Sequence, residues 1–282
     1  MTTPPSTRVL GVGHVGRRLL ETLGADGLPA RGTVRDPGRA DLLRDAGLYC
    51  VPLDLDEHAG AASLGALLEE GEHLVVTLPP DGSGLRARAL AQAVELARPG
   101  RVILLSSTGV YAEVGGGEVD EESPLADTPA ALRRREMEAT LAGACERAGA
   151  PFFALRLPAI YGHGRGLHRS LEAGRIRLWG GGEQLLNRIH VDDIVGAILA
   201  VMEAPADAAG VYNLSDDHPC TLREIVTWLC ERLELPLPPE APLEEAPLTL
   251  QGSKLVRSAR LRERTGWAPR YPSYREGMAA AP

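Results

Sequence analysis

The sequence predicts an α/β protein built on a doubly wound parallel sheet, and three observations support this class. Segments of strand character alternate with helical segments over the first 160 residues, which is typical of a parallel sheet with helices on both faces. A glycine-rich turn follows the first strand. The 282 residues, 44% hydrophobic and 24% charged, are enough for one full core with a smaller domain attached.

The expected elements follow one another in a regular order. We expect strands at residues 8–12, 30–35, 48–55, 73–79, 101–108 and 152–162, with helices at 13–24, 39–47, 85–98 and 129–149. Each helix ends near a glycine or proline. After a basic, glycine-rich stretch (162–184), the pattern predicts strands at 187–191 and 211–215 and helices at 192–204 and 220–235, while the prolines of 236–247 predict irregular chain.

The turn after the first strand reads G-x-G-x-x-G, with Gly11, Gly13 and Gly16 around His14 and Val15. In a strand–turn–helix context, this spacing predicts a dinucleotide loop, because the glycines allow a tight turn and a close approach of the backbone to a pyrophosphate. The alternative is a strand–helix turn without a ligand. We therefore expect a Rossmann-type NAD(P)-binding domain over 1–160, with 187–214 returning to it, and mainly a smaller substrate-binding domain over 161–282.

The end of the second strand indicates which nucleotide would bind. Arg35 stands where an acidic residue would bind the ribose of NAD, and Arg39 is within reach, so NADP is favoured over NAD. The alternative is a solvated arginine. Asp54, followed by Leu55, ends the third strand and could accept a hydrogen bond from adenine or cap the next helix.

Composition limits the other classes of function. The formal charge of −8 argues against a general nucleic-acid surface. Four scattered cysteines predict reduced thiols and neither disulfides nor a metal site. With no run of 18 apolar residues and no secretion signal, we expect a cytoplasmic protein that does not enter membranes.

Three further motifs carry a resemblance to a known family. The segments LLSSTGVYA (104–112), LRLPAIYG (155–162) and IHVDD (189–193) resemble the extended short-chain dehydrogenase/reductases, the superfamily of nucleotide-sugar epimerases and dehydratases. With GVGHVG as its loop, the chain looks like an atypical bacterial group of NAD(P)-dependent epimerase/dehydratase-like proteins, of YeeZ type. The resemblance spans nearly the whole chain and does not specify a substrate.

The resemblance implies roles for individual residues. Ser107, with Ser106 beside it, matches the serine or threonine that binds the substrate oxygen; hydroxyls at the carboxyl end of a buried strand also face the ligand crevice of such sheets. The alternative is that these hydroxyls close a local turn. Further cofactor contacts are implied for Thr77, Leu78 and Pro79, and substrate contacts for Tyr111, Asn187, Arg188 and His190.

The chain departs from this superfamily at its Tyr-x-x-x-Lys pair. The corresponding helix has Ala130 at the tyrosine position and Arg134 at the lysine position, and Lys254 is the only lysine of the chain. Arg134 could still bind the cofactor ribose, but an arginine side chain stays protonated and so cannot exchange a proton. The remaining candidate proton donors are Tyr111, Tyr161, His163 and Glu136, and we expect Ser107 with Tyr161 or His163 to form the catalytic set.

Two functions remain open at this point. The first is an NADP-dependent oxidoreductase or epimerase of atypical mechanism, acting on a carbonyl or sugar-type molecule that is anionic or polar. The second is a catalytically silent NADP-binding sensor. A nucleic-acid partner ranks third, since the one basic cluster (165–177) suits an anionic substrate better. The resemblance also implies a possible homodimer through residues 84–98 and 130–148.

Overall fold

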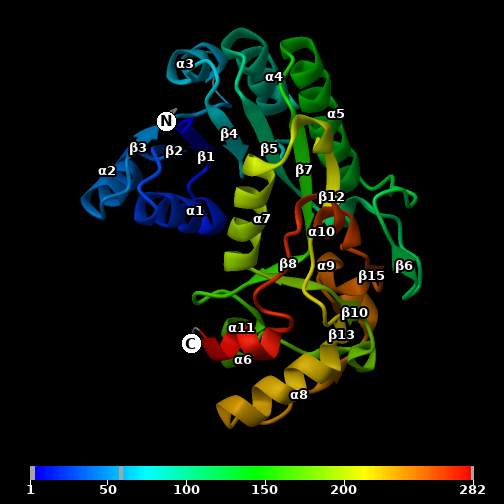
Figure 1. The fold of residues 1–282 in the computed structure, drawn as a ribbon. Coiled ribbons are helices and arrows are strands. Elements are labelled where there is room, and N and C mark those ends of the chain that lie inside the picture. Colours follow the sequence, from blue (N-terminus) through cyan, green and yellow to red (C-terminus); the bar gives the residue numbers. More distant parts are fainter. Residues whose placement is uncertain (1–3, 57–59, 281–282) are drawn as a thin grey trace.

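The computed structural model describes residues 4–56 and 60–280 and is built on a seven-stranded sheet. The strand order is β3-β2-β1-β4-β5-β7-β12, and every neighbouring pair is parallel. Figure 1 shows this sheet in the upper part of the molecule. Its strands are β1 (Thr7–Leu10), β2 (Ala30–Val34), β3 (Cys50–Pro52), β4 (His73–Val76), β5 (Arg101–Ser107), β7 (Phe152–Leu157) and β12 (Gly210–Asn213).

Helices cover both faces of the sheet, because alternate strand residues point to opposite sides. Val9, Val75 and Ile103 face a core shared with α1, α2, α7 and α10. Leu10, Val76 and Leu104 face a second core shared with α3, α4 and α5. The predicted fold class, a doubly wound parallel sheet, is therefore confirmed. The helices are α1 (His14–Ala25), α2 (Pro37–Asp45), α3 (Gly60–Leu67), α4 (Leu85–Ala97), α5 (Pro129–Ala148), α7 (Val191–Glu203) and α10 (Ala259–Thr265).

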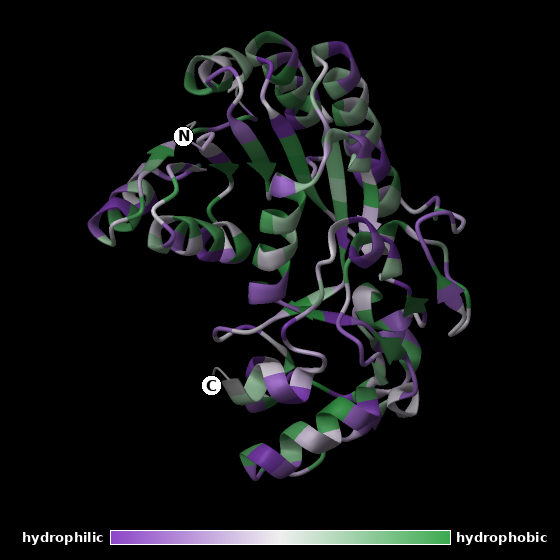
Figure 2. Cartoon of the chain, in the orientation of Figure 1, coloured by the Kyte–Doolittle hydropathy of each residue, from purple (hydrophilic) through white to green (hydrophobic). Residues whose placement is uncertain are grey.

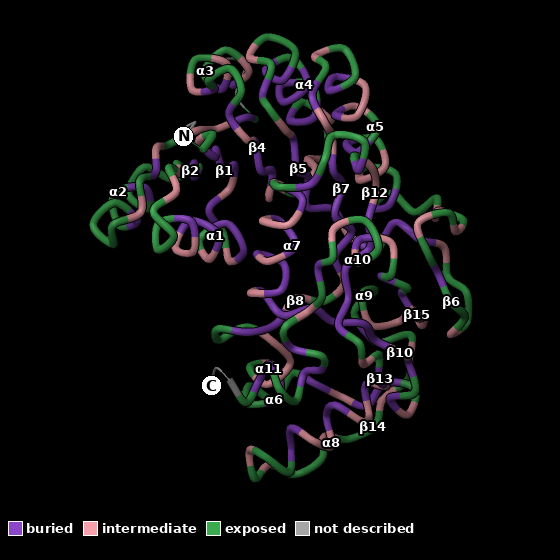
Figure 3. Tube along the Cα trace, viewed as in Figure 1, coloured by how far each residue is buried: buried purple, intermediate pink, exposed green. Residues whose placement is uncertain are grey.

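Local sequence explains where several helices begin. The side chains of Asp36 and Thr128 accept hydrogen bonds from the third amide after them, and a proline follows each cap. Thr221 caps α8 (Leu222–Leu233) in the same way by accepting from the Glu224 amide at 3.1 Å. Figure 2 shows hydrophobic residues along the central strands, and Figure 3 shows the same strands buried.

A second group of elements lies below the sheet in Figure 1 and has its own core, formed by Tyr161, Trp179, Ile225, Leu229, Tyr274 and their neighbours. Its strands are short, and β11 pairs in parallel with β8. The elements are β8 (Ala159–Tyr161), α6 (Leu167–Glu172), β9 (Leu178–Trp179), β10 (Leu185–Leu186), β11 (Arg188–His190), β13 (Cys220–Thr221), α8 (Leu222–Leu233), β14 (Glu240–Ala241), α9 (Leu248–Gln251), β15 (Leu255–Val256) and α11 (Tyr274–Ala280), while β6 (Glu118–Val119) pairs with β15.

The structure adds features that the pattern did not predict. Helix α3 is present, and the proline-rich stretch 236–247 contains β14 and a 3₁₀ turn, Leu243–Glu245. Within α10, Leu261 packs into the core on the α1 face of the sheet, so part of the C-terminal segment belongs to the sheet's covering layer. None of the helices in the described ranges has the length and hydrophobicity needed to cross a bilayer.

Candidate functional site

A cavity of about 700 Å³ opens at the carboxyl ends of the central strands. In open parallel sheets, ligands bind in this crevice, and the volume is in the usual range for a small-molecule site. Most residues predicted to contact a cofactor line it, together with Ser107. They are Gly11, Gly13, His14, Val15, Arg35, Arg39, Asp54, Leu55, Thr77, Leu78, Pro79, Ser106 and Arg134.

The three glycines of the loop differ in backbone conformation and in what surrounds them. Gly11 has a φ of +92°, and a Cβ there would lie 2.6 Å from Leu78 Cδ2. Gly16 does not line the cavity but packs against the turn. A Cβ on Gly16 would lie 2.6 Å from the Gly11 carbonyl oxygen. A Cβ on Gly13 would meet no described atom within 4 Å. Gly13 therefore presents bare backbone to the cavity, as a close approach to a pyrophosphate requires.

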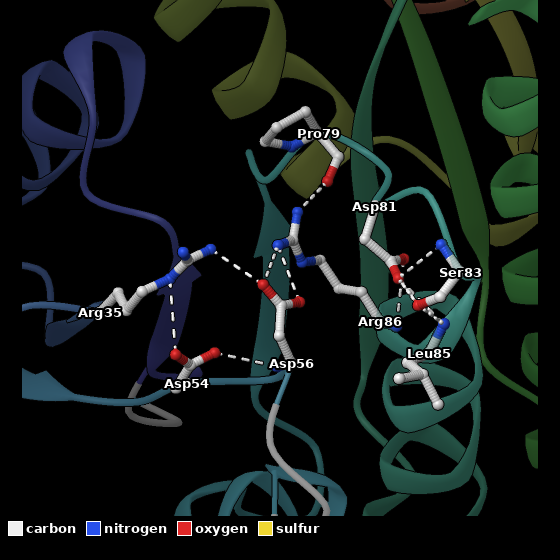
Figure 4. Close-up of polar contacts among 8 residues, drawn as sticks. All are labelled: Arg35, Asp54, Asp56, Pro79, Asp81, Ser83, Leu85 and Arg86. Atoms are coloured by element: carbon white, nitrogen blue, oxygen red, sulfur yellow. Dashed lines mark hydrogen bonds and ion pairs between the residues drawn. The ribbon is translucent and has the colours of Figure 1, made fainter.

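One end of the cavity, which we call the β2 end, is lined by Arg35, Asp36, Arg39 and Asp54. Figure 4 shows Arg35 Nη2 donating to Asp56 Oδ2 at 2.9 Å, with Asp54 Oδ2 at 3.6 Å from Arg35 Nε. The Arg35 side chain is 65% exposed, so these pairs are weak and easily exchanged. The Asp54 carboxylate also accepts the Asp56 amide at 2.9 Å, which makes a local turn.

Arg86 holds the other side of Asp56. Its Nη2 lies 2.8 Å from both Asp56 oxygens, and its Nη1 donates to the Pro79 carbonyl. The Arg86 side chain is buried and lines the cavity. This residue was missed in the sequence because helix periodicity alone does not mark a buried arginine at a helix start.

The opposite end, which we call the β5 end, is lined by Ser106, Ser107, Arg134 and residues 157–160. Ser107 Oγ accepts from the Gly109 amide at 3.1 Å, so the hydroxyl does close a local turn, and its hydrogen is left to donate toward the cavity. Ser106 Oγ donates to Glu138 Oε1. Arg134 has no hydrogen bond or ion pair within the described part of the chain, and burial lowers its pKa.

Of the predicted proton donors, neither tyrosine lines the cavity. Tyr161 is 2% exposed and donates to the Ser273 carbonyl at 3.0 Å, and burial raises the pKa of its phenol well above the usual value. Tyr111 is equally buried and donates to Asn213 Oδ1 at 2.7 Å. His163 and Glu136 are exposed and do not line the cavity either.

The predicted substrate residues of the 187–190 segment make contacts within the protein. Asn187 lies just before β11 and connects it to the chain at β15. Its side chain donates to the Lys254 carbonyl at 2.7 Å and accepts from the Val256 amide at 2.9 Å. Arg188 is buried and donates to Cys220 Sγ. His190 is fully buried beneath Gly162, and burial lowers its pKa to about 4. None of these residues, nor Tyr111, lines the cavity.

His163, His190 and Asp192 lie close enough together to suggest a metal site, since their donor atoms fall within 4.8 Å of one another. Their hydrogen bonds favour another role. Asp192 Oδ1 accepts from Arg18 Nε at 2.6 Å and lies 3.1 Å from His163 Nε2. His190 Nδ1 accepts the Asp192 amide, so in the neutral ring Nε2 carries the proton and has no lone pair for a metal. The cluster instead ties the turn at His163 to α1.

Comparisons with known proteins show the family of the chain. The family model described as the NAD dependent epimerase/dehydratase family matches residues 84–215. A Streptomyces protein, 3-diazoavenalumate denitrifying reductase, is 30% identical over 94% of this chain and 96% of its own. Protein YeeZ of Escherichia coli K12 is 28% identical over 94% and 95%.

Solved structures show the same fold. A conserved protein of unknown function from Silicibacter pomeroyi is 31% identical and superposes with a TM-score of 0.81, covering 98% of this chain and 97% of that one. MoeE5, in complex with UDP-glucose and NAD, is 21% identical with a TM-score of 0.81 over 98% and 96% of the two chains. The loop, the cavity and these relatives together show that the chain belongs to the NAD-dependent epimerase/dehydratase family, with the fold of the extended short-chain dehydrogenase/reductases.

Proposed function

We propose that the protein is an NADP-dependent oxidoreductase that reduces a small polar or anionic molecule. The observation that carries the proposal is the bare backbone of Gly13, which faces the same cavity as Ser107 and Arg134. Loop amides at the start of α1 would bind the pyrophosphate, and Arg134 would bind the nicotinamide ribose. The NAD present in the MoeE5 structure supports a dinucleotide in this cavity.

The β2 end favours NADP over NAD. Arg35 is exposed and Arg39 lines the same wall, where Arg39 Nη2 donates to the Val12 carbonyl at 3.0 Å. A 2′-phosphate would compete for Arg35 with two partly exposed carboxylates, Asp54 and Asp56. Because a phosphate accepts charge-assisted hydrogen bonds from two arginines at once, we infer that it displaces the existing ion pairs.

Replacing Arg35 tests this assignment. We expect Arg35→Ala to raise the Kd for NADPH by about 10–100-fold, the size of one or two charge-assisted hydrogen bonds, while changing the Kd for NADH less than about 3-fold. Fluorescence titration of both nucleotides provides the measurement. Arg31→Ala, which removes an exposed arginine of the same strand that pairs with Glu69, is the matched control. Equal losses for the two nucleotides would refute the NADP assignment.

The side chains lining the cavity offer little acid catalysis. The described lining includes no tyrosine, lysine, cysteine or glutamate. His14 lines it, but burial and the charges of Arg165 and His163 lower its pKa, so it is mostly neutral near pH 7 and a poor acid. Reduction of a ketone needs a proton on the product oxygen. The site therefore favours a substrate whose reduction needs no proton from the protein.

The name of the Streptomyces relative suggests such a substrate, because that protein is a denitrifying reductase of a diazo compound. When bound, NADPH supplies a hydride, which would form a C–H bond at a diazonium carbon while the C–N bond breaks and N₂ leaves with the bonding pair, giving NADP⁺. Charge and atoms balance without proton uptake. In this chain, Ser107 and Arg134 would orient the substrate and the cofactor, and neither would transfer a proton.

Deuterium tracing tests the proposed reaction. Purified protein is given 4-carboxybenzenediazonium and NADPH deuterated at C4, in each of the two stereoisomers, with a protein-free reaction as the blank. We expect one stereoisomer to place deuterium on the ring carbon as N₂ is released, and 4-carboxybenzaldehyde to be reduced at least about 10²-fold more slowly, the usual size of a missing acid catalyst. Faster reduction of the aldehyde would contradict a site without an acid.

A second candidate function is a catalytically silent NADP-binding sensor. The lack of a tyrosine or lysine in the described lining favours it. Tight NADPH binding without oxidation in either reaction would support this candidate over the reductase.

A further inference from the structure

The charges that line the cavity are distributed unevenly. The acidic residues among the described lining residues are Asp36 and Asp54, and both lie at the β2 end. Arg86 also lines the cavity but is paired with Asp56, and the remaining charged lining residues away from the β2 end are Arg134 and Arg165. The part of the cavity beyond the glycine loop therefore carries positive charge without an acidic lining residue to balance it, which favours an anion there.

Arg165 belongs to the turn that follows β8, and this turn holds it in a defined position. Gly162 and Arg165 exchange two backbone hydrogen bonds, of 2.9 and 3.1 Å. Gly162, His163 and Gly164 all have positive φ values, which fold the backbone tightly around the bridge. The hydrogen-bond contact between His163 and Asp192, which itself accepts from Arg18 of α1, fastens this turn to the helix that begins at the glycine loop.

Within the described residues, the guanidinium of Arg165, like that of Arg134 at the β5 end, is not paired with another side chain. Arg18, Arg35 and Arg86 are paired with carboxylates, whereas Arg165 has no side-chain hydrogen bond or ion pair within residues 4–56 and 60–280. The charge of Arg165 acts on a residue that lines the cavity, since it contributes to the lowered pKa of His14. The nearby carboxylate of Asp192 is satisfied by Arg18 and does not line the cavity.

We propose that Arg165 binds a carboxylate group of the substrate and selects acids over their neutral counterparts. The inference rests on the proposed function, because it places the substrate beside a bound dinucleotide. The planar guanidinium suits a carboxylate, with which it forms two parallel hydrogen bonds. Held on a turn that is tied to α1, it fixes the acid relative to the glycine loop and hence relative to the cofactor.

Binding of a matched pair of small molecules tests the proposal without requiring turnover. Benzoate and benzamide are titrated into the NADP⁺-loaded protein and followed by NMR. We expect benzoate to bind at least about 10-fold more tightly than benzamide, and Arg165→Ala to weaken benzoate about 10-fold while leaving benzamide unchanged, as expected for a partly exposed charge-assisted contact. Arg175→Ala, which removes an exposed arginine that does not line the cavity, should leave both affinities unchanged.

The affinity of each variant for NADPH separates the two proposals. If wild-type protein binds no NADPH, the proposed function fails. If NADPH binds but benzoate and benzamide bind equally, or Arg165→Ala binds benzoate as the wild type does, the carboxylate site is wrong. An Arg165→Ala variant that loses NADPH affinity together with benzoate affinity also overturns the proposal, because Arg165 would then serve the cofactor.

Discussion

Glu138 shows how a single residue can hold the β5 end of the cavity together. Its carboxylate receives Arg156 Nη2 at 2.7 Å and Nε at 3.2 Å, as well as the hydroxyl of Ser106. Both charged side chains are less than a tenth exposed. Arg156 also donates to the Tyr111 hydroxyl at 3.0 Å, so this phenol is hydrogen-bonded within the protein. Glu138 thus fastens α5, and with it Arg134 one turn earlier, to β5 and β7.

We expect Glu138→Gln to destabilise the protein by about 3–5 kcal/mol, because Arg156 would remain as a buried charge without a carboxylate partner. Urea unfolding followed by circular dichroism measures the change. Glu136→Gln is the control, since Glu136 is exposed on the same helix and its loss should cost less than about 0.5 kcal/mol. Equal stability of the two variants would show that the buried pair contributes little.

At the scale of helices and strands, pattern predicted most of the sheet and little of the separate core formed around Tyr161 and Tyr274. Strand–helix alternation located α1, α2, α4 and α5 to within a few residues, because each has a clear start or stop signal. Helix α3 was missed because Gly60–Leu67 is short and consists of small residues and leucines, with Gly60 and Leu64 buried and no charged residue. A segment without a polar face has no amphipathic period to detect.

The same reasoning explains which site residues could be predicted. Residues in the turns directly after strands can be predicted to line the cavity from the order of elements alone, because the carboxyl ends of parallel strands meet at one edge of the sheet. Side chains within short strands depend on which face is buried. β11 pairs with β8 in a register that sets His190 beside Tyr161; the Tyr161 ring belongs to the core below the sheet, and His190 is fully buried. The sequence alone does not determine that direction, and the described lining of the cavity does not include Tyr161, Arg188 or His190, for which roles there were predicted.

Across the whole molecule, buried carboxyl groups make stability depend on pH. Asp216 is 3% exposed, and its Oδ1 accepts a bond of 3.3 Å from the His218 amide, while Oδ2 has no partner in the described ranges. Burial raises the pKa of Asp216 to about 7, although the charge of Arg188 partly opposes the shift. Burial also raises the pKa of Asp193, to about 6.

The sign of the pH effect follows from proton binding. Between about pH 4, where an unfolded aspartate titrates, and about pH 7, the folded state binds more protons than the unfolded state, so stability falls as the pH rises through this window.

We expect Asp216→Asn to be more stable than the wild type at pH 8 by roughly 2–4 kcal/mol, the size of a shift of about three pKa units. The difference should shrink as the pH falls toward 4, where Asp216 is protonated in both states. Urea unfolding at pH 5 and pH 8 measures it, with the exposed Asp207→Asn as control. A difference that is the same at both pH values would mean that the Asp216 carboxyl titrates normally and that its burial is relieved by groups that lower its pKa again.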